Sequence, residues 1–369
     1  MTIFLTDYRT ASTDKVELLE DIEYPQNVHW FPDTYERKDT GLVYPPHKLA
    51  DKVLDVKLLE DIKNRPGKTA FILAAGNGHF AGVRTKTPPN NSIAYDYKFL
   101  ALSLTQVYAG RIAQSCGAND LVMTDSSACA SSLKVMMDVV TLMRVYRFDR
   151  VVVLTLEDAV SNAVLRFFGE TKAILSREQE ASGIKPSAFD KTNYGFRIGQ
   201  GAAFAVFERE GLATQPRARL LGAYSASEES TNSIGQRDDG QGFIRAAQGA
   251  LQSAYTLPIE IDVIKTHGTG TLSNNRAERT AIEALMATPF VATSLKQRIG
   301  HTMGASGLLE TCLLLDYMSK GVVPEILNRT EKDEVYLSEP AEAKPKSTIL
   351  SLAAGMGNIY SAAIFSTDI

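Results

Sequence analysis

Short apolar runs alternate with longer amphipathic stretches along most of the chain. Residues 68–75 form an apolar run that ends at Gly76, which is typical of a buried strand. The same pattern predicts further strands at 120–124, 151–156, 201–207, 218–225, 261–266, 348–353 and 361–365. Apolar positions at helical spacing predict helices at 96–113, 130–146, 243–255, 278–286 and 302–321. The polar, irregular segment 168–194 is predicted to be a surface loop or insertion.

The order of these elements recurs in two parts of the chain. Each part has a strand, a turn of small residues, a buried helix and further strands. The seam falls near 208–216, where charged residues, a glycine and a proline cluster. The sequence therefore predicts two pseudo-duplicated halves, 1–212 and 213–369. Because the strands are almost continuously apolar, we expect an α/β fold with helices on both faces of its sheets.

Composition and charge narrow the class of protein. The chain has 369 residues, of which 44% are apolar and 22% charged, the profile of a soluble globular protein. Its net charge of −4 gives no field that favours nucleic acid or an anionic membrane. No apolar run reaches the roughly 18 residues that span a bilayer, and the opening residues show no export signal. The 3 cysteines have no metal-like spacing, so we expect a cytoplasmic protein that binds no metal.

One of these cysteines has an unusual position. Cys129 lies in the small-residue stretch 124–133, between a predicted strand and a long apolar helix. At a helix N-terminus, the dipole and the free N–H groups favour the thiolate. Cys116 and Cys312 fall within helical apolar runs, where ordinary buried cysteines are expected. Cys129 is therefore the candidate nucleophile.

Two histidines lie far downstream of Cys129, each in a glycine-rich loop. His267 follows a predicted strand, and His301 begins a predicted helix. Glycines let backbone and ligand approach closely, and the positive end of a helix keeps an imidazole neutral. A neutral imidazole can donate a hydrogen bond to a developing oxyanion. Together with the thiol, the two rings indicate acyl-thioester chemistry. No role is expected for the other histidines, His29, His47 and His79.

Several motifs resemble those of one enzyme family. Residues 125–132, Asp-Ser-Ser-Ala-Cys-Ala-Ser-Ser, resemble the nucleophile motif of β-ketoacyl-acyl-carrier-protein synthases of the I/II type. Residues 267–271, His-Gly-Thr-Gly-Thr, with Glu278 downstream, resemble their first histidine motif. Residues 294–296 and 300–307 resemble the lysine and second histidine motifs. The stretches that resemble the mid-chain segment and the C-terminal glycine turn are 188–190, 194–202 and 355–357.

The resemblance implies a thiolase-like fold of two halves in five α-β-α-β-α layers. It also implies a decarboxylating Claisen condensation in fatty-acid, polyketide or polyene biosynthesis. The cysteine would take an acyl group from a carrier protein, and malonyl-carrier protein would lose CO2 and attack that group. The product would be a 3-oxoacyl-carrier protein. No cofactor is implied beyond the 4′-phosphopantetheine that arrives on the carrier as part of the substrate.

The resemblance assigns catalytic roles to five residues. Cys129 would be the nucleophile, and His267 and His301 would stabilise the enolate oxygen. Lys296 would order His301 and the local charge network together with Glu310. A purely structural ion pair is the alternative reading of these last two residues.

Further residues are implied to bind the substrate. The backbone N–H groups of Cys129 and Met356 would form the oxyanion hole. Thr269 and Thr271 would contact the pantetheine or malonyl group. Met356 stands where many relatives carry a phenylalanine that gates the acyl pocket, so the gate here would have a more flexible side chain.

Two further departures keep an alternative function open. Gln200 stands where the family usually has glutamate, and Asn275 where it usually has aspartate. Both remove a negative charge, which fits a partner subunit of the chain-length-factor kind with little activity of its own. An enzyme of the Cys-His-Asn branch is a further alternative, because 357–363 resembles its asparagine motif. A zinc protein or a cysteine protease fits less well, since no spacing suits zinc and a protease needs one histidine.

The implied partner is an acyl carrier protein, which is acidic and needs a basic docking surface. The candidates for that surface are Lys63, Arg65, Lys68, Arg144 and Arg147. We also expect a dimer joined along strand 151–156, either a homodimer or a heterodimer with a second ketosynthase-like subunit. Neither nucleic acid nor a membrane is an expected partner.

Overall fold

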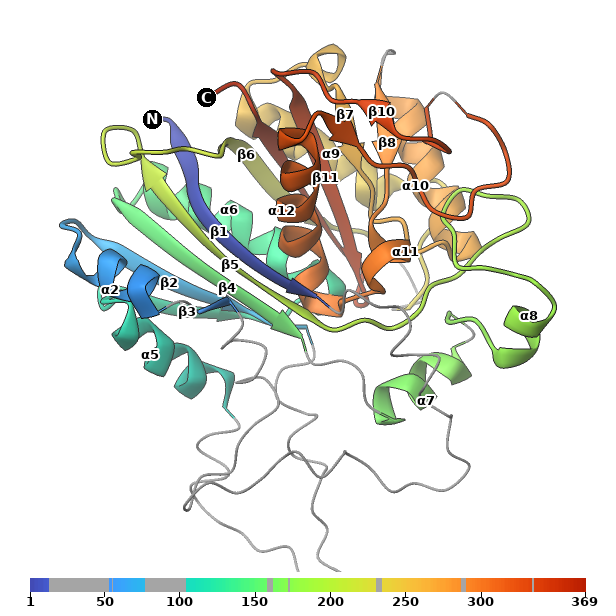
Figure 1. Ribbon diagram of the computed structural model, residues 1–369, viewed down its shortest axis with the longest axis horizontal. Coiled ribbons are helices and arrows are strands. Elements are labelled where there is room, and N and C mark those ends of the chain that lie inside the picture. Colours follow the sequence, from blue (N-terminus) through green and yellow to red (C-terminus); the bar gives the residue numbers. More distant parts are fainter. Residues whose placement is uncertain are drawn as a thin grey trace, which may run out of the picture.

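The fold comes from a computed structural model that describes residues 1–12, 53–54, 56–76, 104–157, 162–171, 173–229, 234–286, 290–333 and 335–369 (Figure 1). Residues 96–103 of the first predicted helix lie outside these ranges. So do His29, His47 and His79, for which the expectation of no role stays a prediction.

The largest feature of the described chain is one mixed sheet of 10 strands in two sets. The first set is β1 (Ile3–Ser12), β2 (Thr69–Ala74), β3 (Leu121–Asp125), β4 (Arg150–Glu157) and β5 (Gly201–Arg209). The second is β6 (Ala218–Ser227), β7 (Val263–Lys265), β8 (Val291–Thr293), β11 (Thr348–Gly355) and β12 (Ile359–Ser366). The strand order is β3-β2-β4-β5-β1-β6-β12-β11-β7-β8, and the sets meet where β1 pairs with β6. A short separate ribbon pairs β9 (Val322–Val323) with β10 (Ala341–Glu342).

The second set of strands repeats the first. If the strands of each set are numbered 1 to 5 in chain order, both sets have the order 3, 2, 4, 5, 1 from the outer edge of the sheet to its centre. In both sets the three outer strands are parallel and the two inner ones are antiparallel to their neighbours. The internal repeat predicted from the sequence is therefore present. Residues 210–217 connect the two sets, and the boundary between 212 and 213 stays a prediction.

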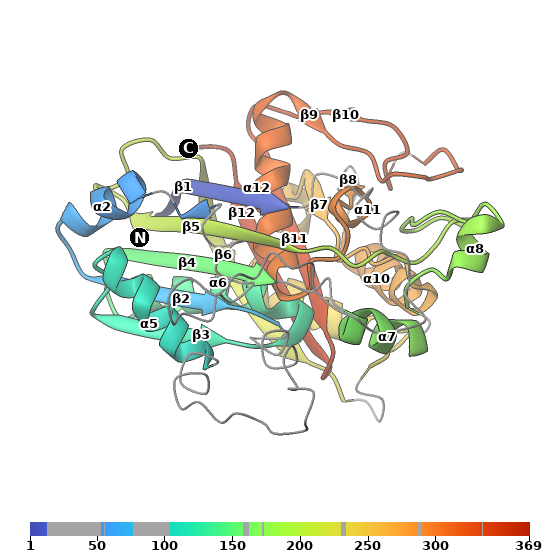
Figure 2. The same ribbon diagram turned by 60° about the horizontal axis from the view of Figure 1, so that its bottom comes forward.

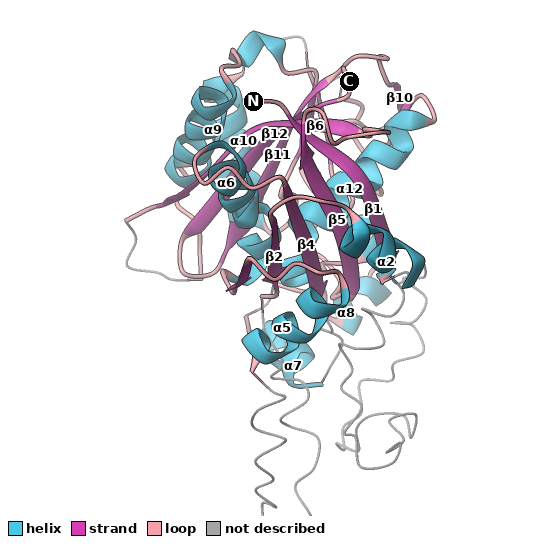
Figure 3. Cartoon of the chain, turned by 90° about the vertical axis from the view of Figure 1, so that its left-hand side faces the viewer, coloured by secondary structure: helices cyan, strands magenta, loops and turns pink. Residues whose placement is uncertain are grey.

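Helices complete the layers. The two central ones, α6 (Ser131–Arg144) and α12 (Ser306–Ser319), each contact strands of both sets (Figure 1). The outer face of the first half-sheet carries α2 (Val56–Asn64) and α5 (Thr105–Ser115), and that of the second carries α9 (Gln241–Ala254) and α10 (Leu272–Leu285) (Figure 3). The resulting α-β-α-β-α order confirms the thiolase-like fold. The remaining helices in the described part of the chain are α7 (Asn162–Glu170), α8 (Arg177–Ala181), α11 (Lys296–Ile299), η2 (Ala128–Ala130), η3 (Pro258–Glu260) and η4 (Met303–Ala305).

The alternation of side chains along β2 shows how each half-sheet separates two cores. Ala70, Ile72 and Ala74 pack in the central core with α6 and α12. Phe71 and Leu73 point to the other face and pack under α2 and α5. Because both faces are covered, every residue of this strand is buried, which explains its continuous apolar sequence.

Several elements differ from the predictions made from hydropathy. β1 was not predicted, because a register shift between Leu5 and Asp7 breaks its period of two. α10 begins at Leu272 and not at 278, because its first turns bury the polar Asn274 and Glu278 and give no apolar signal. The segment 168–194, predicted to be irregular, contains the end of α7 and all of α8.

The predicted dimer edge is wrong. β4 lies inside the sheet, hydrogen-bonded to β2 on one side and to β5 on the other (Figure 2). The outermost strand of the first half is β3, and its residues are partly exposed. Apolar content misled the prediction, because all of β4 is buried as a central strand should be.

No helix among the described residues is both long and apolar enough to cross a bilayer.

Candidate active site

Cys129 lies on a tight turn between β3 and the central helix α6. It is the middle residue of η2, and the preceding residue, Ala128, has a positive φ of 48°. Only 6% of Cys129 is exposed, and its Sγ lies 3.8 Å from Sδ of Met303. It belongs to an apolar cluster with Phe196 and Ile198. The turn therefore places the thiol among buried apolar side chains at the end of the sheet.

Burial decides the charge of this thiol. Loss of solvent raises the pKa of Cys129 to about 12, and the negative charge of Glu157 adds to the rise. The ammonium of Lys296 acts in the opposite direction but does not outweigh burial. The prediction that the helix N-terminus favours the thiolate is therefore outweighed, and the resting thiol is protonated at neutral pH. A base or a substrate group must take its proton for acyl transfer.

His267 lies in the loop that follows β7. The carboxylate of Glu278, on α10, accepts hydrogen bonds from the backbone N–H groups of His267 and Gly268 at 2.5 and 2.9 Å. Asn274 donates to the same carboxylate. Nδ1 of His267 is buried without a hydrogen-bond partner among the described residues, so this ring can still accept or donate one bond to a substrate.

His301 lies beside the first ring, with 5.8 Å between the two ring centroids. Its backbone forms a bridge with Ile198, and its Nδ1 lies 2.9 Å from Oγ of Ser306. The predicted helix starts only at Ser306, after η4, so His301 is not its first residue. Its neutral state has another cause: burial, followed by the charge of Lys296, lowers the pKa of both imidazoles well below the usual value.

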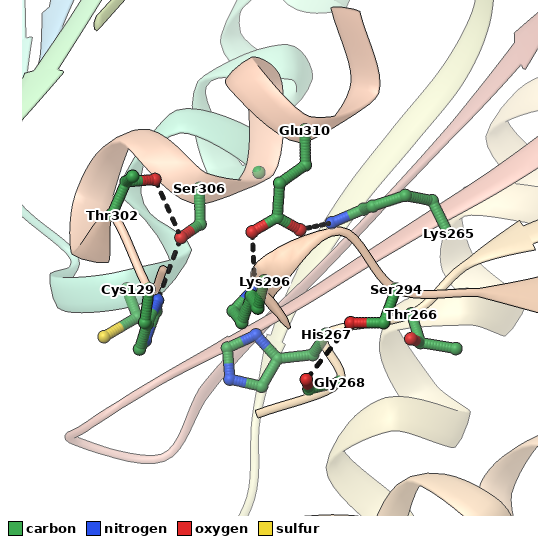
Figure 4. Close-up of polar contacts among 12 residues, drawn as sticks. Cys129, Lys265, Thr266, His267, Gly268, Ser294, Lys296, Thr302, Ser306 and Glu310 are labelled. Atoms are coloured by element: carbon green, nitrogen blue, oxygen red, sulfur yellow. Dashed lines mark hydrogen bonds and ion pairs between the residues drawn. The ribbon is translucent and has the colours of Figure 1, made fainter. Parts of the chain in front are cut away.

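Lys296 links these groups electrostatically. Its ammonium lowers the pKa of Cys129, His267 and His301, and it donates to Oε1 of Glu310 at 2.7 Å. Figure 4 shows this pair above the His267 loop. The structure thus brings the five predicted catalytic residues together from η2, the β7–α10 loop, α11, the loop before η4, and α12. Their catalytic roles stay predictions.

A second buried lysine was missed by the sequence reasoning. Lys265, on β7, donates to Oε2 of Glu310 at 3.2 Å, so that carboxylate contacts two ammonium groups (Figure 4). One signal was present in the sequence. Lys265 is a charged residue at the end of an apolar strand, two residues before His267.

Glu157 was also missed. Its buried carboxylate accepts from the backbone N–H of Gly76 at 2.7 Å and of Gly304 at 3.1 Å. A Cβ on Gly304 would lie 2.1 Å from the nitrogen of Gly76, so only glycine permits this approach. Glu157 therefore joins the end of β2 to η4, which carries Met303 beside the thiol. These contacts span 81 and 147 residues, and no local pattern reports them.

The predicted oxyanion turn lies against the cysteine turn. A Cβ on Gly355 would come within 2.7 Å of the Ser127 oxygen and 3.3 Å of the Cys129 nitrogen. Met356 follows it and packs on the apolar cluster that contains Cys129. The two backbone segments are thus close enough for their N–H groups to donate hydrogen bonds to one oxygen, which is the arrangement that an oxyanion hole needs.

The predicted substrate threonines lie in the His267 loop. Thr269 is buried, and its hydroxyl lies 3.2 Å from that of Thr271, the residue at the N-cap position of α10. Asn275 donates weakly to Gly270 at 3.4 Å, and its Oδ1 is buried without a partner among the described residues. Among all residues that the structure describes, no group of three or more His, Cys, Asp or Glu side chains could hold a metal ion.

The predicted carrier-docking residues lie far from the thiol. Lys63, Arg65 and Lys68 precede β2, whereas the thiol lies at the level of its other end. Arg144 ends α6, about 20 Å from Cys129 at 1.5 Å per residue. Its guanidinium also donates to the carbonyls of Ser253 and Leu221. Their role in receiving a carrier protein stays a prediction.

Comparison with known proteins agrees with the geometry. Residues 48–213 match the beta-ketoacyl synthase N-terminal domain, and residues 217–330 match the C-terminal domain of the same family. A beta-ketoacyl synthase named for the oxytetracycline polyketide, from Streptomyces rimosus, is 28% identical over 74% of this chain and 66% of its own length. The tetracenomycin ketoacyl synthase alpha subunit of Streptomyces glaucescens is 28% identical over 69% of this chain and 62% of its own.

Solved structures agree on the fold. One chain of a type II polyketide acyl-carrier protein in complex with its ketosynthase superposes with a TM-score of 0.77 at 19% identity, over 99% of this chain and 98% of that one. An oxazolomycin ketosynthase domain from Streptomyces albus gives 0.65 at 17% identity, over 85% of this chain and 56% of that one.

Fold and site together define a thiolase-like protein built around one cysteine and two histidines. More narrowly, the chain belongs to the β-ketoacyl synthase family. It spans about two-thirds of the length of the curated relatives named above.

Proposed function

We propose that this protein is a condensing enzyme of a type II polyketide system, acting as a 3-oxoacyl-acyl-carrier-protein synthase. The observation that carries the proposal is the convergence of one buried thiol and two neutral imidazoles around Lys296. The names of its relatives, which refer to polyketide ketosynthases, support the same substrate class.

In the first step, Sγ of Cys129 attacks the thioester carbon of an acyl-carrier protein. The carbon–sulfur bond to pantetheine breaks, and the thiol proton leaves with the pantetheine sulfur. The N–H groups of Cys129 and Met356 hold the oxyanion of the tetrahedral intermediate. One such donor is worth about 3 kcal/mol of transition-state stabilisation in other enzymes.

In the second step, malonyl-carrier protein binds beside the acylated cysteine. Its carbon–carboxylate bond breaks and releases CO2, and the electron pair moves onto the thioester oxygen as an enolate. His267 and His301 donate hydrogen bonds to that oxygen, for which each neutral ring must carry its proton on the facing nitrogen. The enolate carbon then attacks the acyl group, and Cys129 leaves as the thiolate and regains a proton.

The experiment that tests the proposal separates these two steps. The purified protein is mixed with acyl-carrier and malonyl-carrier thioesters, and the 3-oxoacyl product is measured by mass spectrometry. We expect Cys129→Ala to abolish both acyl transfer and condensation. We expect His301→Ala to leave acyl transfer largely intact and to abolish condensation. A wild type that forms product at the rate of Cys129→Ala would refute the proposal.

A partner-subunit function is the second candidate, because Gln200 and Asn275 remove two negative charges that the family usually has. In that case the chain would act beside an active ketosynthase subunit and shape the product. Assembly of the complex with Cys129→Ala distinguishes the two readings, since a partner subunit would lose no turnover. The outer strand β3, with one side unpaired among the described strands, is the proposed edge for either a homodimer or a heterodimer.

The carrier protein is the proposed substrate-bearing partner, and its pantetheine arm would supply the thioester. Since the site needs only thiol, imidazole and backbone N–H groups, no further cofactor is proposed. The cytoplasm is the proposed location, because the three cysteines of the chain are all free.

A further inference from the structure

We propose that Lys265 is a positioning residue of this site, which holds Glu310 so that Glu310 in turn holds Lys296 beside the two histidines. For its catalytic consequence the inference rests on the proposed function. The contacts of Lys265, Glu310 and Lys296 lie within the chain, so this part of the inference can be tested without measuring turnover.

The contacts around Glu310 give the first argument. Lys265 donates to Oε2 at 3.2 Å and to the carbonyl of Leu352, on the neighbouring strand β11, at 3.0 Å. Lys296 donates to Oε1 at 2.7 Å. All three charged side chains have no exposed surface. With one cation on each oxygen, the carboxylate of Glu310 cannot rotate without breaking a charge-assisted hydrogen bond.

The origin of the three residues gives the second argument. Lys265 comes from a strand of the C-terminal half-sheet, Glu310 from the central helix α12, and Lys296 from the short helix α11. α11 has only 4 residues, which is too short to hold a side chain rigidly by itself. The link from β7 through Glu310 therefore ties Lys296 to the sheet, and the same strand leads directly into the His267 loop.

The charge count gives the third argument. The ammonium groups of Lys265 and Lys296 share the carboxylate of Glu310 beside the imidazoles. Burial lowers the pKa of Lys265 and Glu310 opposes that change. The charge of Lys265 also lowers the pKa of His267 and of His301. The charge of Lys265 therefore disfavours protonation of both rings, and it favours the negative charge that develops on an enolate oxygen.

Other titratable groups lie in or around the site on several elements. They are Glu278 of α10, Lys296 of α11, Glu310 of α12, Glu157 of β4 and Cys129 of η2. Lys296 is the cation of this list, and Lys265 is the second one of the site. If Lys265 served stability alone, a buried apolar side chain would suit the position better, because a buried ion pair often stabilises less than apolar packing.

The test compares Lys265→Met and Lys265→Gln with the wild type in the full-length protein. The first measurement is the NMR titration of 13C-labelled histidine, which needs no substrate. We expect both rings to stay neutral in the wild type down to the acid limit of the fold, and to begin titrating at higher pH in both variants. Lys265→Gln can keep a hydrogen bond to Glu310 without a charge, so it tests the charge itself.

The second measurement is condensation. We expect kcat to fall about 10- to 100-fold in Lys265→Met, the usual effect of losing a hydrogen bond to a charged group. We expect KM for the carrier substrates to stay within about twofold, because the carrier docks outside the buried cluster. In a Glu310→Gln background the same substitution should lower kcat by a smaller factor, because the part of its effect that passes through Glu310 is already lost.

Arg150→Met is the matched control. It removes another buried cation, the partner of Glu208 at the far end of β4, and it should lower stability without moving the histidine titration. The proposal is overturned if Lys265→Met loses stability like this control and leaves the histidines and kcat unchanged. It is also overturned if its effect on kcat persists in full in the Glu310→Gln background. If the wild type forms no product, the proposed function fails, and the histidine titration still decides whether Lys265 acts as inferred.

Discussion

The hydrogen bond between Ser306 and His301 offers a sharp test of the two-step account. Oγ of Ser306 lies 2.9 Å from Nδ1 of His301 and 3.2 Å from the hydroxyl of Thr302. If Ser306 donates to Nδ1, the proton of the neutral ring is on Nε2, the nitrogen free to donate to an enolate. Ser306→Ala removes this control of the tautomer.

The size of the effect follows from burial. Ser306 and His301 are both buried, so the substitution leaves Nδ1 without its partner at a cost of about 1–3 kcal/mol. If that cost falls on the enolate step, decarboxylation slows about 5- to 150-fold. Acyl transfer to Cys129 should change little, because it depends on the thiol and the oxyanion turn. The assay follows CO2 release from malonyl-carrier protein and, separately, acyl adducts by intact mass.

Thr311→Val is the matched control for this prediction. It removes another buried hydroxyl of α12, which contacts Gly307 and Ser351 and neither imidazole. We expect it to leave both rates within about twofold of the wild type. The reasoning is refuted if Ser306→Ala leaves decarboxylation intact, or if it slows acyl transfer by the same factor.

Three further predictions concern pH and packing. Because burial raises the pKa of Cys129 to about 12, the rate of its alkylation by iodoacetamide should rise about tenfold per pH unit between about pH 6 and 9. Peptide mass spectrometry measures this rate, and a plateau in the range would contradict the prediction. Burial lowers the pKa of His301 in the folded chain, so the unfolded chain takes up the proton first as pH falls below about 6.5. The folding stability that depends on the neutral ring is therefore present above that pH. Below it, this stability is lost by up to about 1.4 kcal/mol per pH unit. Urea unfolding at several pH values should therefore show a smaller acid loss in His301→Gln than in the wild type, and identical slopes would count against it. Gly355→Ala should cost about 1–3 kcal/mol of stability, because its Cβ would overlap the Ser127 oxygen; in a thermal melt, Gly110→Ala on α5, which has open space around it, serves as control and should stabilise.

Much of the site could be predicted because its residues lie in short local motifs. Cys129, His267 and His301 each lie in a turn of small residues, and such turns exist where a backbone must approach closely or turn sharply. Gly355 shows the same requirement in three dimensions, since any side chain there would strike the cysteine turn. The alternation of buried strands and helices also predicted the repeat, because both faces of each half-sheet are covered.

The parts that escaped prediction depend on contacts between distant segments. Lys265 and Glu157 are single charged residues at the ends of apolar strands, and only the folded chain reveals their partners. The misplaced dimer edge has a related cause, since a strand sequence reports burial and not its neighbours. The protonated state of Cys129 could not be predicted either, because it results from the depth of burial and not from the turn that carries it.

The most direct measurement is the intact mass of the protein after exposure to an acyl-carrier protein, followed by malonyl-carrier protein. The account predicts one acyl adduct on Cys129 that disappears when malonyl-carrier protein is added, with no adduct on Cys129→Ala. An adduct of equal extent on Cys129→Ala, or none on either protein with any acyl chain, would contradict it.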